Sequence, residues 1–245
     1  MDCKVNLIIH GSLNDFLEPA NKTNSVEYKY GLSLSVKDAI EAIGIPHPEV
    51  GLILIGDLSV DFSYLLRDGE TIEVYPHLNH PSVGTDKVLP FLPDGKASFI
   101  LDVHLGRLAH YLRIAGFDSL YYPKDPGDSH IAQIAEAENR IVLTRDMGLL
   151  KRSAVSYGHW LRNTESRAQF REVVHYYNLR KDFNPFSRCV KCNGLIKRVE
   201  KASIEEFLPH GIKRDFNEFY QCSHCGQIYW QGSHYKGLSE FLESF

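Results

Sequence analysis

Two short apolar runs, each leading into an aspartate, constrain the fold of this 245-residue chain more than any other feature. The runs at 98–101 and 140–144 have the length of buried strands, and Asp102 and Asp146 follow them. Helical patterns lie between the runs, so the order of elements predicts a parallel α/β sheet. Since the carboxyl ends of parallel strands border the ligand crevice, Asp102 and Asp146 would face one cleft if their strands are neighbours.

Two amphipathic helices are predicted between these strands. The first covers about 104–115 and ends at Gly116, which favours the left-handed conformation of a helix terminus. The second begins at Asp128 or Ser129 as its N-cap and ends before Asn139. The apolar positions that define the two helices are Leu105, Leu108, Ala109, Leu112 and Ala115, followed by Ile131, Ile134 and Ala135.

Three carboxylates therefore occupy positions where strands and helices change over: Asp102, Asp128 and Asp146. Gathered in one cleft they would repel each other unless a cation lay among them, and hard oxygen ligands suit Mg²⁺ or Mn²⁺. Two such ions can activate water for in-line hydrolysis of a phosphodiester. The alternative is that all three residues only end strands or cap helices, because aspartate is a leading cap residue.

Five longer motifs occur in order along the chain: LDVHLGRLAHYLRIAGFD, Asp128 with the following IAQIAEAENRIVLTRD, QFREVVHYYNL, FSRCVKCNG and CSHCGQIYWQGSHY. Over about residues 97 to 240 they resemble the Mut-seven C-terminal ribonuclease family of PIN-like nucleases. The resemblance implies a PIN-like α/β nuclease domain with an appended zinc ribbon, and metal-dependent cleavage of RNA. It also implies an acidic catalytic site at Asp102, Asp128 and Asp146, with Thr144 and Arg145 completing the T-R-D signature.

Four cysteines form two knuckles, Cys189-x-x-Cys192 and Cys222-x-x-Cys225, separated by 29 residues. Four thiolates in this pairing suit tetrahedral, structural Zn²⁺, with no position left open for chemistry. Disulfides are the competing explanation, which a cytosolic chain does not favour. Cys3 is left over as an unpaired strand residue.

Residues 1–78 predict a separate β-grasp (ubiquitin-like) domain, because a strand pair, a helix and further strands follow one another in some seventy residues. The helix covers 36–43, with Ser35 as its N-cap and Gly44 as its stop. The segment resembles the ubiquitin-like sulfur carriers of the molybdopterin and thiamine pathways. It lacks their terminal Gly-Gly, so we expect either a docking surface for RNA or protein, or a stabilising cap.

Polar, Pro-rich and Gly-rich residues at 79–96 predict a linker to the nuclease domain, 97–184, which the zinc ribbon module follows at 185–240. Residues 1–80 should then be removable without unfolding the nuclease.

Basic residues near the acidic positions could form an RNA-binding rim, although any one of them could equally be ordinary solvated surface. They are Arg107, Arg113, Arg145, Lys151 and Arg152. The net charge of −4 requires any RNA contact to come from such a local patch.

The aromatic segment IYWQGSHY after the second knuckle could stack on unpaired bases, but packing against the nuclease core is favoured. Asp118 and Asp125 are further acids that spacing alone does not rank.

No apolar stretch has the length of a membrane span and no basic, apolar leader opens the chain, so we expect a cytoplasmic protein. The sequence is consistent with two functions. The first is a Mg²⁺- or Mn²⁺-dependent ribonuclease with RNA as its partner. The second is a non-catalytic RNA-binding or adaptor protein that recruits a protein partner through its ubiquitin-like domain.

Overall fold

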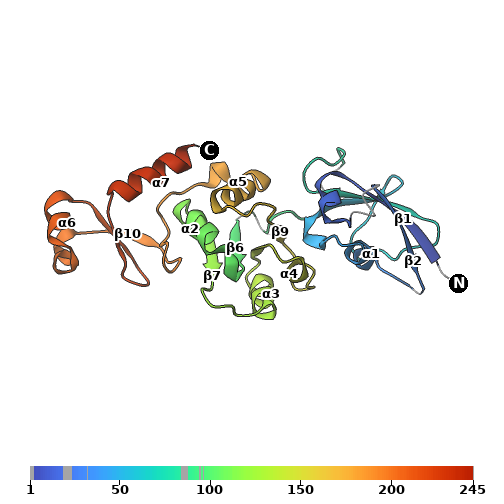
Figure 1. Cartoon of the computed structure of the whole chain (residues 1–245), viewed down its shortest axis with the longest axis horizontal. Coiled ribbons are helices and arrows are strands. Elements are labelled where there is room, and N and C mark those ends of the chain that lie inside the picture. Colours follow the sequence, from blue (N-terminus) through green and yellow to red (C-terminus); the bar gives the residue numbers. More distant parts are fainter. Residues whose placement is uncertain are drawn as a thin grey trace. The chain divides into compact units, whose positions relative to one another are not determined.

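The computed structural model describes residues 3–18, 24–31, 33–83, 88–93, 95 and 97–244 (Figure 1). Residues 84–87, 94 and 96 of the predicted linker lie outside the described residues. The chain divides into two compact units, each made of two separate stretches. The first unit contains 1–96 and 127–160, and the second contains 97–126 and 161–245. The predicted domain boundaries stay predictions.

A five-stranded mixed sheet with strand order β2-β1-β5-β3-β4 forms the amino-terminal part of the first unit. The central strands β1 and β5 are parallel, whereas the β1–β2, β3–β5 and β3–β4 pairs are antiparallel. The elements are β1 (Cys3–Ile9), η1 (Gly11–Phe16), β2 (Ser25–Tyr30), α1 (Val36–Ala42), η3 (His47–Glu49), β3 (Val50–Ile55), β4 (Leu58–Ser59) and β5 (Thr71–Pro76). One helix on a mixed sheet of this order confirms the β-grasp prediction.

Local sequence explains these elements. In β1 the alternate residues Val5, Leu7 and Ile9 are buried, as a strand with one covered face requires. The Ser35 hydroxyl accepts a hydrogen bond from the backbone N–H of Asp38 at 3.1 Å, which caps α1 as predicted. Gly44 follows the helix with φ of 114°, a conformation in which a side chain would meet the carbonyl oxygen of Phe16.

The first unit continues with α3 (Asp128–Ala137), β8 (Ile141–Thr144), α4 (Met147–Leu150) and β9 (Gly158–Trp160). Strands β8 and β9 pair in parallel. The N-cap of α3 is Gly127, with φ of 83°, so the prediction of Asp128 or Ser129 as the cap was wrong by one residue. Asn139, with φ of 49°, follows the end of the helix as expected.

The β-grasp strands and β9 share a core within this unit. Glu49 and His159 are each 1% exposed, and Oε1 of Glu49 lies 3.0 Å from Nδ1 of His159. The same carboxylate oxygen accepts a hydrogen bond from the backbone N–H of Trp160 at 2.6 Å. The Trp160 ring packs against Phe16, with ring centroids 5.4 Å apart. Removal of residues 1–80 would expose this core, so the structure argues against the predicted independence of the nuclease segment.

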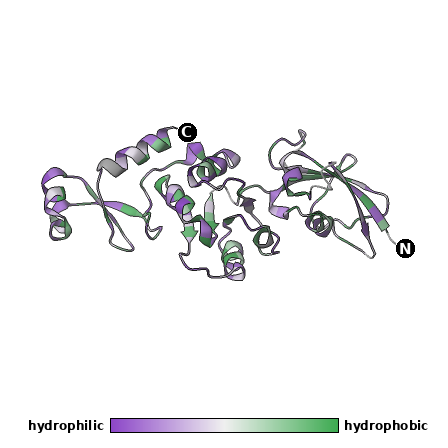
Figure 2. Cartoon of the chain, in the orientation of Figure 1, coloured by the Kyte–Doolittle hydropathy of each residue, from purple (hydrophilic) through white to green (hydrophobic). Residues whose placement is uncertain are grey.

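The second unit begins with β6 (Ser98–Leu101), η5 (Val103–Leu105), α2 (Gly106–Ile114) and β7 (Asp118–Tyr121), and continues with α5 (Ser166–Tyr176) and η6 (Leu179–Asp182). Strands β6 and β7 pair in parallel. The helix expected over 104–115 is present, although its first turn is a 3-10 helix. Both α2 and α5 carry hydrophobic and hydrophilic residues (Figure 2), because each covers a core on one face only.

A small antiparallel sheet of order β10-β11-β12 completes the second unit. Its elements are β10 (Ile196–Val199), η7 (Lys201–Ser203), η8 (Glu205–Phe207), α6 (His210–Asp215), β11 (Phe219–Cys222), β12 (Ile228–Tyr229) and, after it, α7 (Ser233–Glu243). Ile204, Leu208 and Phe219 form a small core beside this sheet. The chain therefore has a mixed α/β fold that contains a β-grasp domain, parallel strand pairs and a cysteine-bearing ribbon.

Among the helices of the described residues, none has the length and hydropathy that a membrane span needs.

We predict that Glu49→Ala destabilises the protein by about 3–5 kcal/mol, because it leaves His159 and the N–H of Trp160 without their buried partner. Thermal and urea unfolding of the full chain measure the loss. Glu27→Ala is the matched control, since Glu27 pairs with Lys4 at 3.3 Å and is 53% exposed, and this change should cost about 0–1 kcal/mol. Equal stability of the two variants would contradict a shared core.

Candidate functional site

The T-R-D motif forms a hydrogen-bonded turn between β8 and α4. Thr144 is buried, and its hydroxyl oxygen accepts a hydrogen bond from the backbone N–H of Asp146 at 2.9 Å. Oδ1 of Asp146 in turn accepts one from the backbone N–H of Gly148 at 2.7 Å, which makes Asp146 the N-cap of α4. The motif therefore fixes the direction of an exposed carboxylate by two local hydrogen bonds.

Two residues that sequence reasoning missed support this turn. A side chain on Gly148 would lie 3.1 Å from Oδ1 of Asp146, so glycine permits the close approach of the carboxylate. The indole Nε1 of Trp160 donates to the backbone carbonyl of Arg145 at 3.1 Å. Since the backbone of Trp160 is itself bonded to Glu49, the β-grasp domain is connected to the T-R-D turn through one residue.

Asp102 directly follows β6 and is 9% exposed. Its Oδ1 accepts a hydrogen bond from the backbone N–H of His104 at 2.7 Å, so it caps η5. The hydroxyl of Tyr121 donates to the carbonyl of Val103 at 3.0 Å and holds the same turn from β7. Gly106 makes room for this ring, because an added Cβ would lie 2.8 Å from it. No pattern in the sequence indicated this role of Tyr121.

Asp128 is the first residue of α3, and its Oδ2 lies 3.8 Å from Nη2 of Arg152, with both side chains more than 40% exposed. Asp128 and Asp146 belong to the first unit, whereas Asp102 belongs to the second. The convergence of all three carboxylates involves both units and stays a prediction.

The cap alternative describes what two of these aspartates do, but it does not compete with metal binding. An ionised carboxylate has two oxygens and about four lone-pair positions, and each cap occupies one of them. Each of the three side chains offers carboxylate oxygens, the type of ligand that Mg²⁺ and Mn²⁺ prefer.

The five predicted RNA-binding residues divide by exposure. Arg107 on α2, Arg145 in the T-R-D turn and Arg152 after α4 are exposed. Arg113 is 6% exposed, and its guanidinium donates to the carbonyls of Ser119 and Val190, which argues against the predicted RNA contact.

Lys151 also has a structural contact. Its Nζ donates to the backbone carbonyl of Glu41 at 2.8 Å, and burial lowers its pKa. Lys151 therefore binds α1 of the β-grasp domain to the end of α4 and is not a freely available phosphate contact.

The four knuckle cysteines come together as predicted. One sulfur from each of Cys189, Cys192, Cys222 and Cys225 lies within 4.8 Å of the others, a group able to hold one metal ion. The backbone N–H groups of His224 and Cys225 approach the Cys222 sulfur at 3.4 and 3.5 Å, as donors that would stabilise a thiolate. The spacing and the ligand chemistry fit a structural zinc.

Their surroundings shift the pKa values of two of these thiols in opposite directions, and burial raises the pKa of Cys192 to about 12. Burial opposes ionisation of Cys189, but hydrogen bonds from the Tyr229 hydroxyl and from the backbone N–H groups of Cys192 and Lys191 lower its pKa to about 7. The Tyr229 oxygen lies 3.0 Å from the Cys189 sulfur. Hydrogen-bond donors that contact a metal ligand in this way orient it and tune its basicity.

Asn193 joins the first knuckle to β7. It has φ of 68°, and its side chain accepts from the backbone N–H of Ser119 at 3.0 Å and donates to Asp118 at 2.8 Å. Asp118 also lies 3.1 Å from Nη2 of Arg188. Asp118 therefore attaches the ribbon to strand β7, and these contacts give it a structural role.

The side chains of the aromatic segment after the second knuckle contact residues of the ribbon, and their predicted packing against the nuclease core stays a prediction. Tyr229 contacts the cysteine cluster, and Trp230 packs against the core of the ribbon. Tyr235 lies against Phe186, with ring centroids 4.2 Å apart and ring planes inclined by 32°.

Two family models match the chain. One, described as the Mut7-C RNAse domain, matches residues 97–242, more than half of the chain. The other, described as Mut7-C ubiquitin, matches residues 3–81. No curated protein and no solved structure matches.

We predict about one tightly bound zinc per chain, lost in Cys222→Ser together with part of the thermal stability, because a structural zinc site contributes directly to folding. Metal analysis and thermal unfolding measure both effects. Cys3→Ser is the control, since Cys3 is a half-buried cysteine of β1 outside the cluster, and it should keep full zinc content. Full zinc in Cys222→Ser would disprove the ribbon assignment.

Proposed function

Because this chain belongs to the family of the Mut7-C RNAse domain, we propose that it is a metal-dependent ribonuclease that hydrolyses phosphodiester bonds of RNA. The observation that carries the proposal is the T-R-D turn. Buried Thr144 accepts a hydrogen bond from the backbone N–H of Asp146, and Gly148 leaves room for the Asp146 carboxylate that caps α4. Together they hold this exposed carboxylate in one direction. Such preorganisation is what a metal ligand requires.

We assign metal binding to Asp102, Asp128 and Asp146, which would hold one or two Mg²⁺ or Mn²⁺ ions. When bound, the metal would supply Lewis-acid activation of water and stabilise charge on the phosphate. Asp102 and Asp146 each keep one oxygen on a backbone N–H, so their second oxygens are turned in a fixed direction. The exposed Arg107, Arg145 and Arg152 are the candidates for holding the RNA backbone.

The β-grasp domain has a proposed role in this activity. Of the two expectations for it, the contacts of Glu49, Trp160 and Lys151 favour a stabilising element that positions the T-R-D turn. Docking of a protein partner on the same domain is compatible with this role.

A second candidate is a non-catalytic RNA-binding or adaptor protein. The observation in its favour is that Asp102 and Asp146 both cap helices, a role that explains their presence without any metal. The two candidates differ in what neutralising Asp146 should do.

We predict that Asp146→Asn abolishes Mn²⁺ binding and Mn²⁺-dependent RNA cleavage while keeping its thermal stability without metal. Asparagine is nearly as good a cap as aspartate, whereas Asp146→Ala should also cost about 0.5–2 kcal/mol. Cleavage of a mixed RNA panel and melting temperatures with and without Mn²⁺ measure these effects.

Asp57→Asn is the matched control, because Asp57 is an exposed acid in the turn between β3 and β4. It should change neither cleavage nor the stabilisation by Mn²⁺. Undiminished cleavage by Asp146→Asn would remove Asp146 from the active site and favour the non-catalytic candidate.

We also predict that Trp160→Phe lowers kcat by up to about tenfold and leaves KM nearly unchanged. The change removes the hydrogen bond to the Arg145 carbonyl, worth about 0.5–1.5 kcal/mol, but retains an aromatic ring against Phe16. Trp160→Ala, which loses both contacts, should reduce stability as well. A purely structural role predicts that stability and kcat fall together in both variants.

A further inference from the structure

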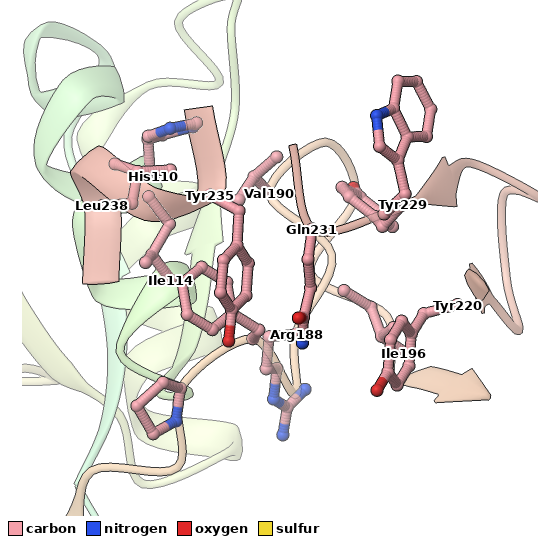
Figure 3. A pocket seen from close by; sticks show the side chains of 13 residues that line it. His110, Ile114, Arg188, Val190, Ile196, Tyr220, Tyr229, Gln231, Tyr235 and Leu238 are labelled. Atoms are coloured by element: carbon pink, nitrogen blue, oxygen red, sulfur yellow. The ribbon is translucent and has the colours of Figure 1, made fainter. Parts of the chain in front are cut away.

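We infer that a pocket between the zinc ribbon and α2 binds one unstacked base of single-stranded RNA. The pocket has a volume of about 350 Å³ and lies within the second unit (Figure 3). Residues of α2, of strands β11 and β12, and of α7 contribute to it. The inference rests on the proposed function and adds the form of RNA that the enzyme would take.

Aromatic and aliphatic side chains form the walls. Tyr220, Tyr229, Trp230 and Tyr235 line the pocket, together with aliphatic residues such as Ile114. Flat aromatic surfaces of this kind attract the faces of nucleobases without requiring a particular sequence.

The polar ends of three lining side chains are available to the edge of a base. Among the described residues, none makes a hydrogen bond to the side chains of Tyr220, Gln231 or Tyr235. Figure 3 shows their polar ends on the same side of the pocket as the guanidinium of Arg188. Hydroxyl and amide groups can donate and accept, as recognition of a base edge requires.

The charge of the pocket favours a neutral group over a phosphate. Its one arginine, Arg188, is paired with Asp118 at 3.1 Å and donates to the carbonyl of Asn193 at 3.0 Å. Burial, with the nearby Arg113 adding, lowers the pKa of His110, which disfavours a charge on that lining imidazole. The walls of this pocket therefore fit a flat, uncharged ligand with polar edges.

The position of the pocket relative to Asp102 supports a substrate role. Asp102 precedes η5 and α2, and Ile114 is the last residue of α2. At about 1.5 Å of rise per residue the two ends are on the order of 18 Å apart. A base in the pocket would thus lie a few nucleotides from a phosphate bound at Asp102.

The test compares two labelled oligomers of equal length and phosphate number, a single-stranded RNA and its abasic counterpart, by fluorescence anisotropy. No divalent metal is added, so cleavage is not needed. Tyr220→Leu and Tyr235→Leu should weaken binding of the RNA about 5- to 150-fold, as loss of one stacking contact predicts, and leave the abasic oligomer unchanged. Phe207→Leu removes a 67% exposed ring outside this pocket and should change neither affinity. Zinc content of each variant shows that the ribbon is intact.

Equal affinity of the wild type for the two oligomers, no binding of either, or unchanged RNA affinity in both tyrosine variants would overturn the pocket assignment. If the true occupant of the pocket is an apolar peptide, the wild type should bind the two oligomers with equal affinity. Base-dependent binding without any Mn²⁺-dependent cleavage would overturn the proposed ribonuclease activity and leave the pocket standing.

Discussion

The buried carboxylate of Glu49 is the constraint on which the first unit depends. A charge at 1% exposure is unfavourable unless it is fully partnered, and its partners, His159 and the N–H of Trp160, lie more than a hundred residues further along the chain. One side chain therefore joins the β-grasp sheet to the end of the nuclease strand β9. From there Trp160 reaches the carbonyl of Arg145, so the same connection extends to the T-R-D turn.

The second unit is organised in a comparable way around the first cysteine knuckle. Asn193 and Arg188 bond to Asp118 and Ser119 of β7, and Arg113 reaches from α2 to Val190. These bonds attach the ribbon to the nuclease strands by polar groups that are largely buried. A structural zinc would then stabilise a surface of the nuclease as well as the ribbon itself.

Local signals in the sequence were sufficient for most elements. Alternation located β1, the Ser35 cap located α1, and the Cys-x-x-Cys pairs located the metal cluster. Apart from the one-residue error at the start of α3, the errors came from contacts distant in sequence. Arg113 occupies a polar position of an amphipathic helix, which predicted an exposed side chain. Residues of β7 and of the ribbon pack on that side and bury it. The pair of Glu49 with His159 was likewise invisible, because nothing within either local segment indicates the other.

The alternation of the two units along the chain has a consequence for folding during synthesis. Residues 97–126, which belong to the second unit, separate the two stretches of the first, so the amino-terminal sheet leaves the ribosome well before β9 does. Until His159 and Trp160 emerge, the Glu49 carboxylate lacks these two partners and the core around Phe16 stays incomplete. Contacts over such separations slow folding. The amino-terminal sheet should therefore pass through an open intermediate, and translation pauses between residues 97 and 160 would prolong its exposure to chaperones.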